Sequence, residues 1–135
     1  MINKAAKPTL MIVDDELNFS ESLRMAIEDI FAVTVAGSLE RAREVLKNNI
    51  PAVILLDLRL PDGEGIELLR ELRGFRRLPI VFIMTAYATV DSFIRTQTEG
   101  VADYFPKPLD ILQLKKALRI ELAKRTLLCA SGPEN

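Results

Sequence analysis

Five short runs rich in apolar residues alternate along the chain with longer segments whose apolar residues recur every three or four positions. The runs cover residues 10–13, 31–36, 52–56, 80–84 and 101–105. Short runs that are apolar at nearly every position are typical of strands buried on both faces of a parallel sheet. The pattern therefore predicts five buried strands.

The segments between and after these runs predict five helices, because their apolar residues fall on one face at helical spacing. They cover residues 17–30, 39–47, 66–72, 90–99 and 111–125. Ser38 and Asp110 are placed to cap the second and fifth helices through a side-chain oxygen. Thr89, Thr96 and Thr98 lower the helical propensity of the fourth.

Strands that alternate with helices build a parallel sheet covered on both faces, because each parallel connection needs a crossover helix. The predicted fold class is therefore α/β, a doubly wound sheet of five parallel strands flanked by five helices. A closed barrel would need eight such units and about 250 residues, whereas the chain has 135. We expect one domain at 9–125, a tail at 1–8, and a tail or the start of a linker at 126–135.

Charge and residue counts exclude several classes of function. Lys and Arg number 18 against 19 for Asp and Glu, a formal net charge of -1, so no overall field attracts nucleic acid or an anionic membrane. The absence of histidine excludes Ser-His-Asp catalysis and His-ligated metals. The single cysteine excludes an intramolecular disulfide. No apolar run is long enough for a membrane span or a signal peptide, which makes a cytoplasmic location the default expectation.

Polar residues follow four of the predicted strands at the points where they end. Asp14 and Asp15 come after the first strand, Asp57 after the third, Thr85 after the fourth and Lys107 after the fifth. Because ligands of open α/β sheets bind at the carboxyl ends of the strands, we expect these side chains in one crevice. Two carboxylates about 4 Å apart repel by about 4 kcal/mol at an effective dielectric near 20. Lys107 and a hard cation such as Mg²⁺, which prefers carboxylate and phosphate oxygens, would offset this repulsion.

A carboxylate beside Mg²⁺, an ammonium and a hydroxyl are the groups needed to move a phosphoryl group onto an oxygen nucleophile. Asp57 is the best placed nucleophile. Four motifs carry these groups: VDDE at 13–16, LDLRLPDG at 56–63, MTA at 84–86 and YFPKP at 104–108. In this order they resemble the receiver domain of bacterial two-component response regulators, over residues 9–124. The resemblance implies a flavodoxin-like, CheY-like sheet with strand order 2-1-3-4-5.

The resemblance also implies a phosphoacceptor signalling domain rather than an enzyme, one that promotes only its own phosphorylation and dephosphorylation. Asp57 matches the residue that takes a phosphoryl group from the phosphohistidine of a sensor histidine kinase. Lys107 matches the lysine that pairs with the phosphoryl oxygens, and its bond to Pro108 occupies the cis-proline position of the family. Thr85 matches the hydroxyl that moves toward the phosphoryl group, and Tyr104 matches the aromatic residue whose rotamer follows it.

The metal site and the tuning positions are carried over in the same way. Asp15 matches the direct Mg²⁺ ligand, helped by Asp14 through water. Asp57 and the backbone carbonyl of Arg59 complete the protein's share of the ligands. Arg59 and Tyr87 stand where the family varies to tune the lifetime of the phosphoryl group.

The implied partners are the sensor kinase and an output domain or downstream protein on the face of the fourth helix, fifth strand and fifth helix. A homodimer through this face is a further option, although VAD at 101–103 lacks one acid of the run common in members that dimerise in this way. Arginines at 70, 73, 76 and 77 and the basic residues of the last helix favour solvated faces, not direct nucleic-acid binding. The chain end predicts the start of a linker, hence the amino-terminal receiver of a longer regulator.

Two alternatives remain open from the residues. One is a Mg²⁺-dependent phosphohydrolase that passes through an aspartyl-phosphate. Such enzymes place the nucleophile and the acid two residues apart after the first strand, whereas Asp14 and Asp15 are adjacent and the candidate nucleophile follows the third strand. The other is a receiver-like domain that binds partners without chemistry, against which the intact set of acids, Thr85 and Lys107 argues.

Overall fold

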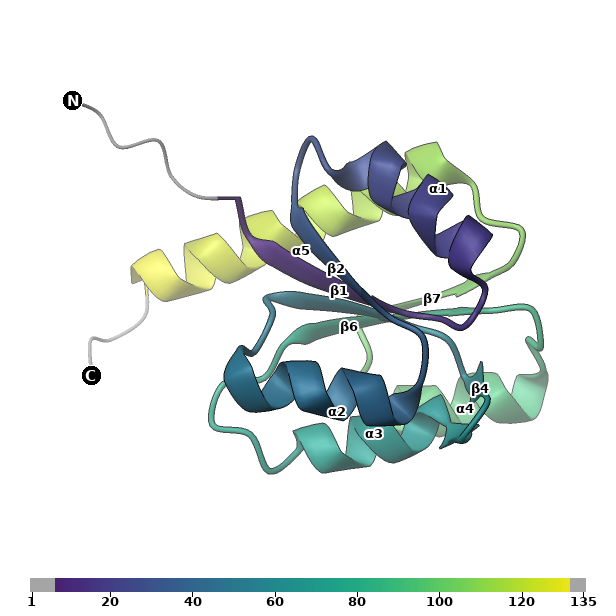
Figure 1. Cartoon of the computed structure of the whole chain (residues 1–135). Helices are drawn as coiled ribbons and strands as arrows, with labels where there is room; N and C mark the ends of the chain where they lie inside the picture. Colours follow the sequence, from purple (N-terminus) through teal and green to yellow (C-terminus); the bar gives the residue numbers. More distant parts are fainter. Residues whose placement is uncertain (1–6, 132–135) are drawn as a thin grey trace.

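The computed structural model describes residues 7–131 and contains the five-stranded parallel sheet that the sequence predicts (Figure 1). The strands are β1 (Thr9–Val13), β2 (Ala32–Ala36), β3 (Val53–Leu56), β6 (Ile80–Thr85) and β7 (Asp103–Pro106). Their order in the sheet is β2-β1-β3-β6-β7. This confirms the order 2-1-3-4-5, because two further strands, β4 (Arg59–Leu60) and β5 (Gly63–Glu64), form a separate hairpin.

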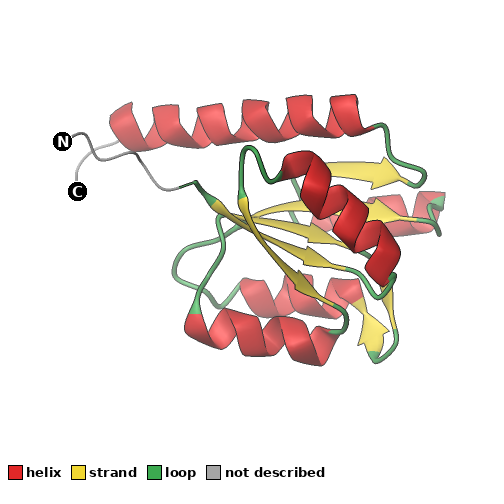
Figure 2. Ribbon diagram, turned by 45° about the horizontal axis from the view of Figure 1, so that its top comes forward, coloured by secondary structure: helices red, strands yellow, loops and turns green. Residues whose placement is uncertain are grey.

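Five helices cover the two faces of the sheet. They are α1 (Leu17–Ile27), α2 (Leu39–Asn48), α3 (Gly65–Leu72), α4 (Val90–Thr98) and α5 (Ile111–Ser131). Figure 1 shows α1 and α5 on one face and α2, α3 and α4 on the other, and Figure 2 shows the strands as the layer between them. Within residues 7–131, no helix has both the length and the apolar character needed to cross a membrane.

The hydrophobic core consists of two clusters, one on each face of the sheet. Met11 and Val13 belong to the cluster under α2 and α3, whereas Leu10 and Ile12 belong to the cluster under α1 and α5. Successive side chains of a strand point to opposite faces, so a strand that is apolar at every position contributes to both clusters. This is why the short apolar runs in the sequence identify the central strands.

The hairpin formed by β4 and β5 was missed by the sequence prediction, which indicated only a turn at this place. Arg59 pairs with Glu64, and Leu60 pairs with Gly63, in an antiparallel arrangement. Strands of two residues are too short to show the alternation by which a strand is recognised. The turn between them carries Asp62, whose carboxylate accepts hydrogen bonds from the first backbone N–H groups of α2, at 2.9 Å each.

Most strand and helix boundaries agree with the predicted ones or differ by one or two residues, but two helices end three or more residues away. The first helix was predicted to reach residue 30, but α1 ends at Ile27, whose carbonyl accepts the N–H groups of Ile30 and Phe31 in a tight turn. The last helix was predicted to end at 125, but α5 continues to Ser131. Residues 126–131 contain neither glycine nor proline, and Gly132 and Pro133 come only afterwards. The remaining parts of the predicted tails, 1–6 and 132–135, lie outside the described residues.

The predicted caps are present, and a third one corrects the reading of the fourth helix. Ser38 caps α2, and the carboxylate of Asp110 accepts backbone N–H groups in the first turn of α5. Thr89, expected only to weaken α4, is its N-cap: its hydroxyl accepts the N–H of Ser92 at 3.0 Å, and the Ser92 hydroxyl accepts the N–H of Thr89 at 3.1 Å. This reciprocal capping box compensates for the low helical propensity of threonine.

Candidate functional site

The ends of neighbouring strands place the predicted site residues at one edge of the sheet. The backbone N–H of Asp57 donates to the carbonyl of Val13 at 2.9 Å, so the pairing of β1 and β3 continues one residue beyond β3. The N–H of Lys107 donates to the carbonyl of Thr85 at 2.8 Å, so the pairing of β6 and β7 continues in the same way. These two hydrogen bonds position the backbone of Asp57 and of Lys107 independently of their side-chain contacts.

Three carboxylates meet at this edge. Asp14, Asp15 and Asp57 each offer an oxygen, and these oxygens all lie within 4.8 Å of one another. Asp14 is fully buried and Asp57 is 5% exposed, whereas Asp15 is exposed. The sequence prediction that these acids converge is therefore confirmed.

Lys107 supplies the positive charge inside the cluster. Its Nζ lies 2.7 Å from Asp14 Oδ2 and 3.3 Å from Asp57 Oδ2, and its side chain is only 10% exposed. Glu16 Oε1 approaches the same Nζ at 3.5 Å from the solvent side. The ammonium also lies 4.2 Å from the centre of the Phe19 ring, which adds a cation–π contact.

Burial and neighbouring charge act in opposite directions on the pKa of Asp57 and on the pKa of Lys107, and both pKa values end above their ordinary values. Burial raises the pKa of Asp57 above its ordinary value, because desolvation disfavours the carboxylate, while the charge of Lys107 opposes that rise. For Lys107, burial alone would lower the pKa, but the hydrogen bond to Asp14 and the charge of Asp57 raise it. The lysine is therefore held as a cation, and it keeps the buried acid closer to its charged form.

The donor set fits a hard divalent cation. Carboxylate oxygens are the ligands that such ions prefer, and the cluster of three acids and one lysine carries an excess of negative charge. Arg59, predicted to add a backbone carbonyl, begins β4 two residues after Asp57, and its N–H donates to Asp57 Oδ1 at 3.3 Å. The role of its carbonyl stays a prediction.

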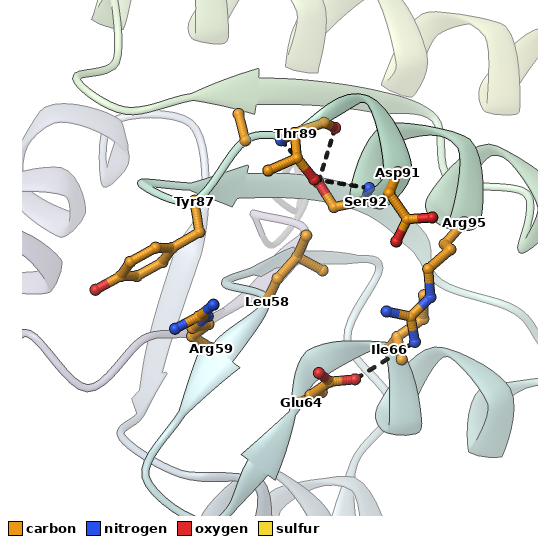
Figure 3. A pocket seen from close by; sticks show the side chains of 10 residues that line it. Leu58, Arg59, Glu64, Ile66, Tyr87, Thr89, Asp91, Ser92 and Arg95 are labelled. Atoms are coloured by element: carbon orange, nitrogen blue, oxygen red, sulfur yellow. Dashed lines mark hydrogen bonds and ion pairs between the residues drawn. The ribbon is translucent and has the colours of Figure 1, made fainter.

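The predicted tuning residues lie against each other beside the cluster. The guanidinium carbon of Arg59 lies 4.2 Å from the centre of the Tyr87 ring, and Figure 3 shows the two side chains together at the rim of a pocket of about 290 Å³. Glu64 and Arg95 form an ion pair at 3.4 Å on the other side of this pocket. The pocket thus connects the hairpin that follows Asp57 with the start of α4.

The two predicted switch residues have partners that the sequence analysis did not identify. Thr85 is fully buried, and its hydroxyl oxygen accepts the backbone N–H of Tyr87 at 3.0 Å. Tyr104 OH lies 2.6 Å from Ser92 Oγ, and its ring packs edge-on against Phe93 with centroids 5.3 Å apart. Within residues 7–125, whose side chains are described, no hydrogen bond joins Thr85 to Asp57 or to Tyr104. Ser92 and Phe93 could have been suspected only from their places in the first turn of the fourth helix.

Gly65 is a further residue that sequence reasoning missed. A Cβ at this position would lie 2.3 Å from the carbonyl oxygen of Asp57, and the Gly65 N–H donates to the Leu58 carbonyl at 2.8 Å. The absence of a side chain therefore lets α3 start directly against the backbone of the candidate nucleophile. The short spacing between Gly63 and Gly65 is the only signal in the sequence.

Comparison with known proteins agrees with this geometry. The family model described as the response regulator receiver domain matches residues 10–119. The chain is 34% identical over 125 residues to the KDP operon transcriptional regulatory protein KdpE of Escherichia coli, covering 92% of this chain and 55% of that protein. It is 32% identical over 128 residues to the photosynthetic apparatus regulatory protein RegA of Rhodobacter capsulatus, covering 94% of this chain and 67% of that protein. The chain thus spans about half of KdpE and two thirds of RegA.

A solved structure shows the same fold. The signal receiver domain of a putative Luxo repressor protein from Vibrio parahaemolyticus superposes with a TM-score of 0.87 at 22% identity, covering 95% of this chain and 99% of that one. The family match over most of the chain, together with the acids and the lysine at the expected strand ends, settles its membership. The chain is a receiver domain of the two-component response regulator family.

Proposed function

We propose that Asp57 accepts a phosphoryl group from the phosphohistidine of a sensor kinase with the help of Mg²⁺, and that the domain is the amino-terminal receiver of a longer regulator. The observation that carries the proposal is a buried carboxylate with a cation 3.3 Å from one oxygen and two further carboxylates beside it. Burial of this much negative charge costs desolvation free energy unless a bound cation neutralises it.

The residues support an in-line transfer. An oxygen of Asp57 would form a bond to phosphorus while the phosphorus–nitrogen bond of the donor breaks and its electron pair leaves on the imidazole nitrogen. Catalysis of such a transfer is mostly alignment and neutralisation of charge on the equatorial oxygens. Lys107, held beside Asp57, is placed to neutralise part of that charge.

Asp14, Asp15 and Asp57 would hold the dication, with the Arg59 carbonyl as a further ligand. When bound, Mg²⁺ supplies charge neutralisation at the phosphoryl oxygens. Without it, Lys107 is the cation that offsets the charge of these acids among the described side chains. The lysine pairs with both buried acids, Asp14 and Asp57, while the exposed Asp15 stays open to solvent.

The proposed switch runs from Thr85 to Tyr104 and on to α4. The Thr85 hydroxyl accepts a bond from Tyr87 and has its own proton available for a phosphoryl oxygen. A new phosphoryl group that draws this hydroxyl would free space beside Tyr104. Tyr104 is tied to α4 through Ser92 and Phe93, so movement of its ring would be transmitted to that helix.

The proposed readout surface lies on α4, β7 and α5. Val90 is 77% exposed, Ile94 is 57% exposed and Phe93 is 46% exposed, and all three belong to the helix that Tyr104 contacts. Exposed apolar side chains on a surface helix favour recognition by a protein partner. We propose that phosphorylation changes the affinity of this surface for an output domain or a second protein.

Incubation with acetyl phosphate and Mg²⁺ followed by intact-mass measurement tests the chemistry. We expect a single base-labile phosphoryl adduct that disappears in Asp57→Asn. The matched control is Asp62→Asn, which removes a carboxylate five residues away that caps α2 instead of joining the cluster. An adduct that persists in Asp57→Asn, or rapid multiple-turnover hydrolysis of phosphomonoesters, would contradict the proposal and the latter would favour a phosphohydrolase.

Thermal unfolding with and without Mg²⁺ tests the metal site separately. Because a ligand that binds the native state stabilises it by mass action, millimolar Mg²⁺ should raise the melting temperature of the wild type and leave that of Asp15→Ala unchanged. Asp91→Ala, which removes an exposed acid in the first turn of α4, should keep the full rise. A wild-type curve that Mg²⁺ does not move would exclude the metal site.

A further inference from the structure

A second concave site lies at the edge of the sheet opposite the acidic cluster. The loops that lead into β1, β3 and β6 and one side of α5 line an open groove of about 730 Å³, here called the basal groove. Among the residues that the structure describes, the charged ones that line it are Lys7, Arg76, Arg77 and Arg125, and none of these described lining residues carries a carboxylate. Four like charges around one groove, in a chain with a formal net charge of -1, concentrate positive potential at this place.

The charges of Arg76 and Arg77 are not neutralised by the described part of the chain. Two other arginines precede them in the same segment, and both are paired: Arg70 and Arg73 form ion pairs with Glu99, whose side chain is 6% exposed. Arg76 and Arg77 are exposed and form no hydrogen bond or ion pair with any side chain or carbonyl described in the structure. A role as solvated surface charge does not explain why these two arginines share one groove with two further cations.

The other two cations are each held by a backbone carbonyl. Arg125 Nη2 donates to the carbonyl of Leu78 at 2.6 Å, which fixes the guanidinium beside the groove and leaves its other N–H donors available. Lys7 Nζ donates to the carbonyl of Glu28 at 2.6 Å. Ordering of long cationic side chains before any ligand arrives reduces the entropy lost on binding.

Apolar side chains complete the groove. Ile50 is 38% exposed and Leu78 is 53% exposed, and both line it together with the cations. A groove of this volume is within the range of small-molecule sites, and guanidinium groups recognise phosphate through paired N–H donors. The ligand class that matches both features is a polyphosphate joined to an apolar or planar body.

We propose that the basal groove binds a nucleotide, with its phosphates on Arg76, Arg77 and Arg125 and its base against Ile50 and Leu78. This site is separate from Asp57 and does not depend on phosphorylation. A nucleic-acid duplex fits the observations less well, because these cations line a concave site rather than a flat face and the chain as a whole is slightly acidic.

The test is a titration of the 135-residue chain against a fluorescent nucleoside triphosphate, followed by anisotropy in EDTA so that no dication bridges phosphate to the acidic cluster. We expect saturable binding that weakens with salt. The double variant Arg76→Ala/Arg77→Ala should raise Kd at least about tenfold, since each lost charge-assisted hydrogen bond is worth that much. The matched control, Lys116→Ala/Arg119→Ala, removes two exposed cations of α5 outside the groove and should leave Kd within about twofold.

Competition identifies the recognised parts of the ligand. Displacement of the probe by pyrophosphate, and more strongly by unlabelled nucleoside triphosphate, supports the assignment of both the phosphates and the base. Pyrophosphate that competes as well as the nucleotide would overturn the assignment of the base. Absence of saturable binding, an equal loss in the control variant, or preferential binding of a short DNA duplex through Arg76 and Arg77 would overturn the proposal. Unchanged binding in Asp57→Asn is expected, so the outcome is independent of the phosphoacceptor chemistry.

Discussion

Replacement of Lys107 by methionine tests whether the acidic cluster depends on one buried cation. Methionine keeps an unbranched side chain that can still pack on Phe19, but it removes the only positive charge within hydrogen-bonding distance of Asp14 and Asp57 among the described side chains. The change leaves carboxylate oxygens within 4.8 Å of one another without compensation. We expect a large loss of stability when no divalent cation is present.

The distances give the size of the effect. At an effective dielectric near 20, attraction over 2.7 Å to Asp14 and over 3.3 Å to Asp57 corresponds to about 6 and about 5 kcal/mol. Removal of the ammonium also removes the cost of burying it, which offsets part of this sum. Loss of one partner of a buried ion pair typically costs about 3–5 kcal/mol. For a domain of this size, such a loss lowers the melting temperature by about 10–20 °C.

Urea unfolding at neutral pH in EDTA, then in millimolar Mg²⁺, measures the effect. Lys115→Met is the control, because Lys115 pairs with an Asp29 that is largely exposed, at 3.2 Å, and should lose far less. Mg²⁺ should stabilise Lys107→Met more than the wild type, since the dication takes over neutralisation that the lysine provides. A Lys107→Met variant as stable as the wild type in EDTA, or an equal gain from Mg²⁺ in both proteins, would refute the electrostatic account.

Three further predictions follow from single contacts. Gly65→Ala places a Cβ 2.3 Å from the Asp57 carbonyl and should cost about 1–3 kcal/mol of unfolding free energy, whereas Gly74→Ala, whose nearest neighbour would lie at 3.7 Å, should be nearly neutral. The raised pKa of Asp57 means that the folded state binds a proton more tightly than the unfolded chain, so in EDTA this group favours folding below its ordinary pKa and the contribution is lost as pH rises through the raised value. The free energy of unfolding of Asp57→Asn should therefore rise relative to that of the wild type as pH increases from about 4 to 7. A difference in unfolding free energy that stays constant over this range would contradict the raised pKa. Thr89→Ala removes one half of the capping box with Ser92 and should cost about 1 kcal/mol by urea unfolding, with hydrogen exchange in α4 accelerated; unchanged exchange would show that the cap does not hold this helix end.

The sheet and the acidic cluster were predictable from the sequence because both depend on short-range features. A run such as 53–56 is buried on both faces, and the acid that ends it must lie at the carboxyl edge of the sheet. Asp14 and Asp57 are 43 residues apart, yet the parallel pairing of their strands brings them together. Lys107 follows from the same rule applied to the last strand.

The contacts made by side chains from different elements were not predictable in this way. The bond between Tyr104 and Ser92 depends on the rotation of α4 relative to β7, which no local pattern specifies. The ring of Phe19 under Lys107 depends equally on how α1 docks. Arg73 pairs with Glu99, whereas Arg77 lines the basal groove. The sequence does not distinguish these two arginines, because their segment has the pattern of a single solvated face.

The charge of the cluster gives a physical reason for the proposed response of a hydroxyl at the end of β6 to phosphorylation. Three carboxylates and one ammonium leave two excess negative charges, and a bound dication brings the sum to zero. A phosphoryl group on Asp57 then adds about one negative charge, and the site needs a further donor. Thr85, at the end of the adjacent strand, has a suitable group: it is fully buried, its oxygen already accepts the Tyr87 N–H, and its proton is available to donate. The position of that proton donor, and with it the ring of Tyr104 and the start of α4, would therefore depend on a single unit of charge at Asp57.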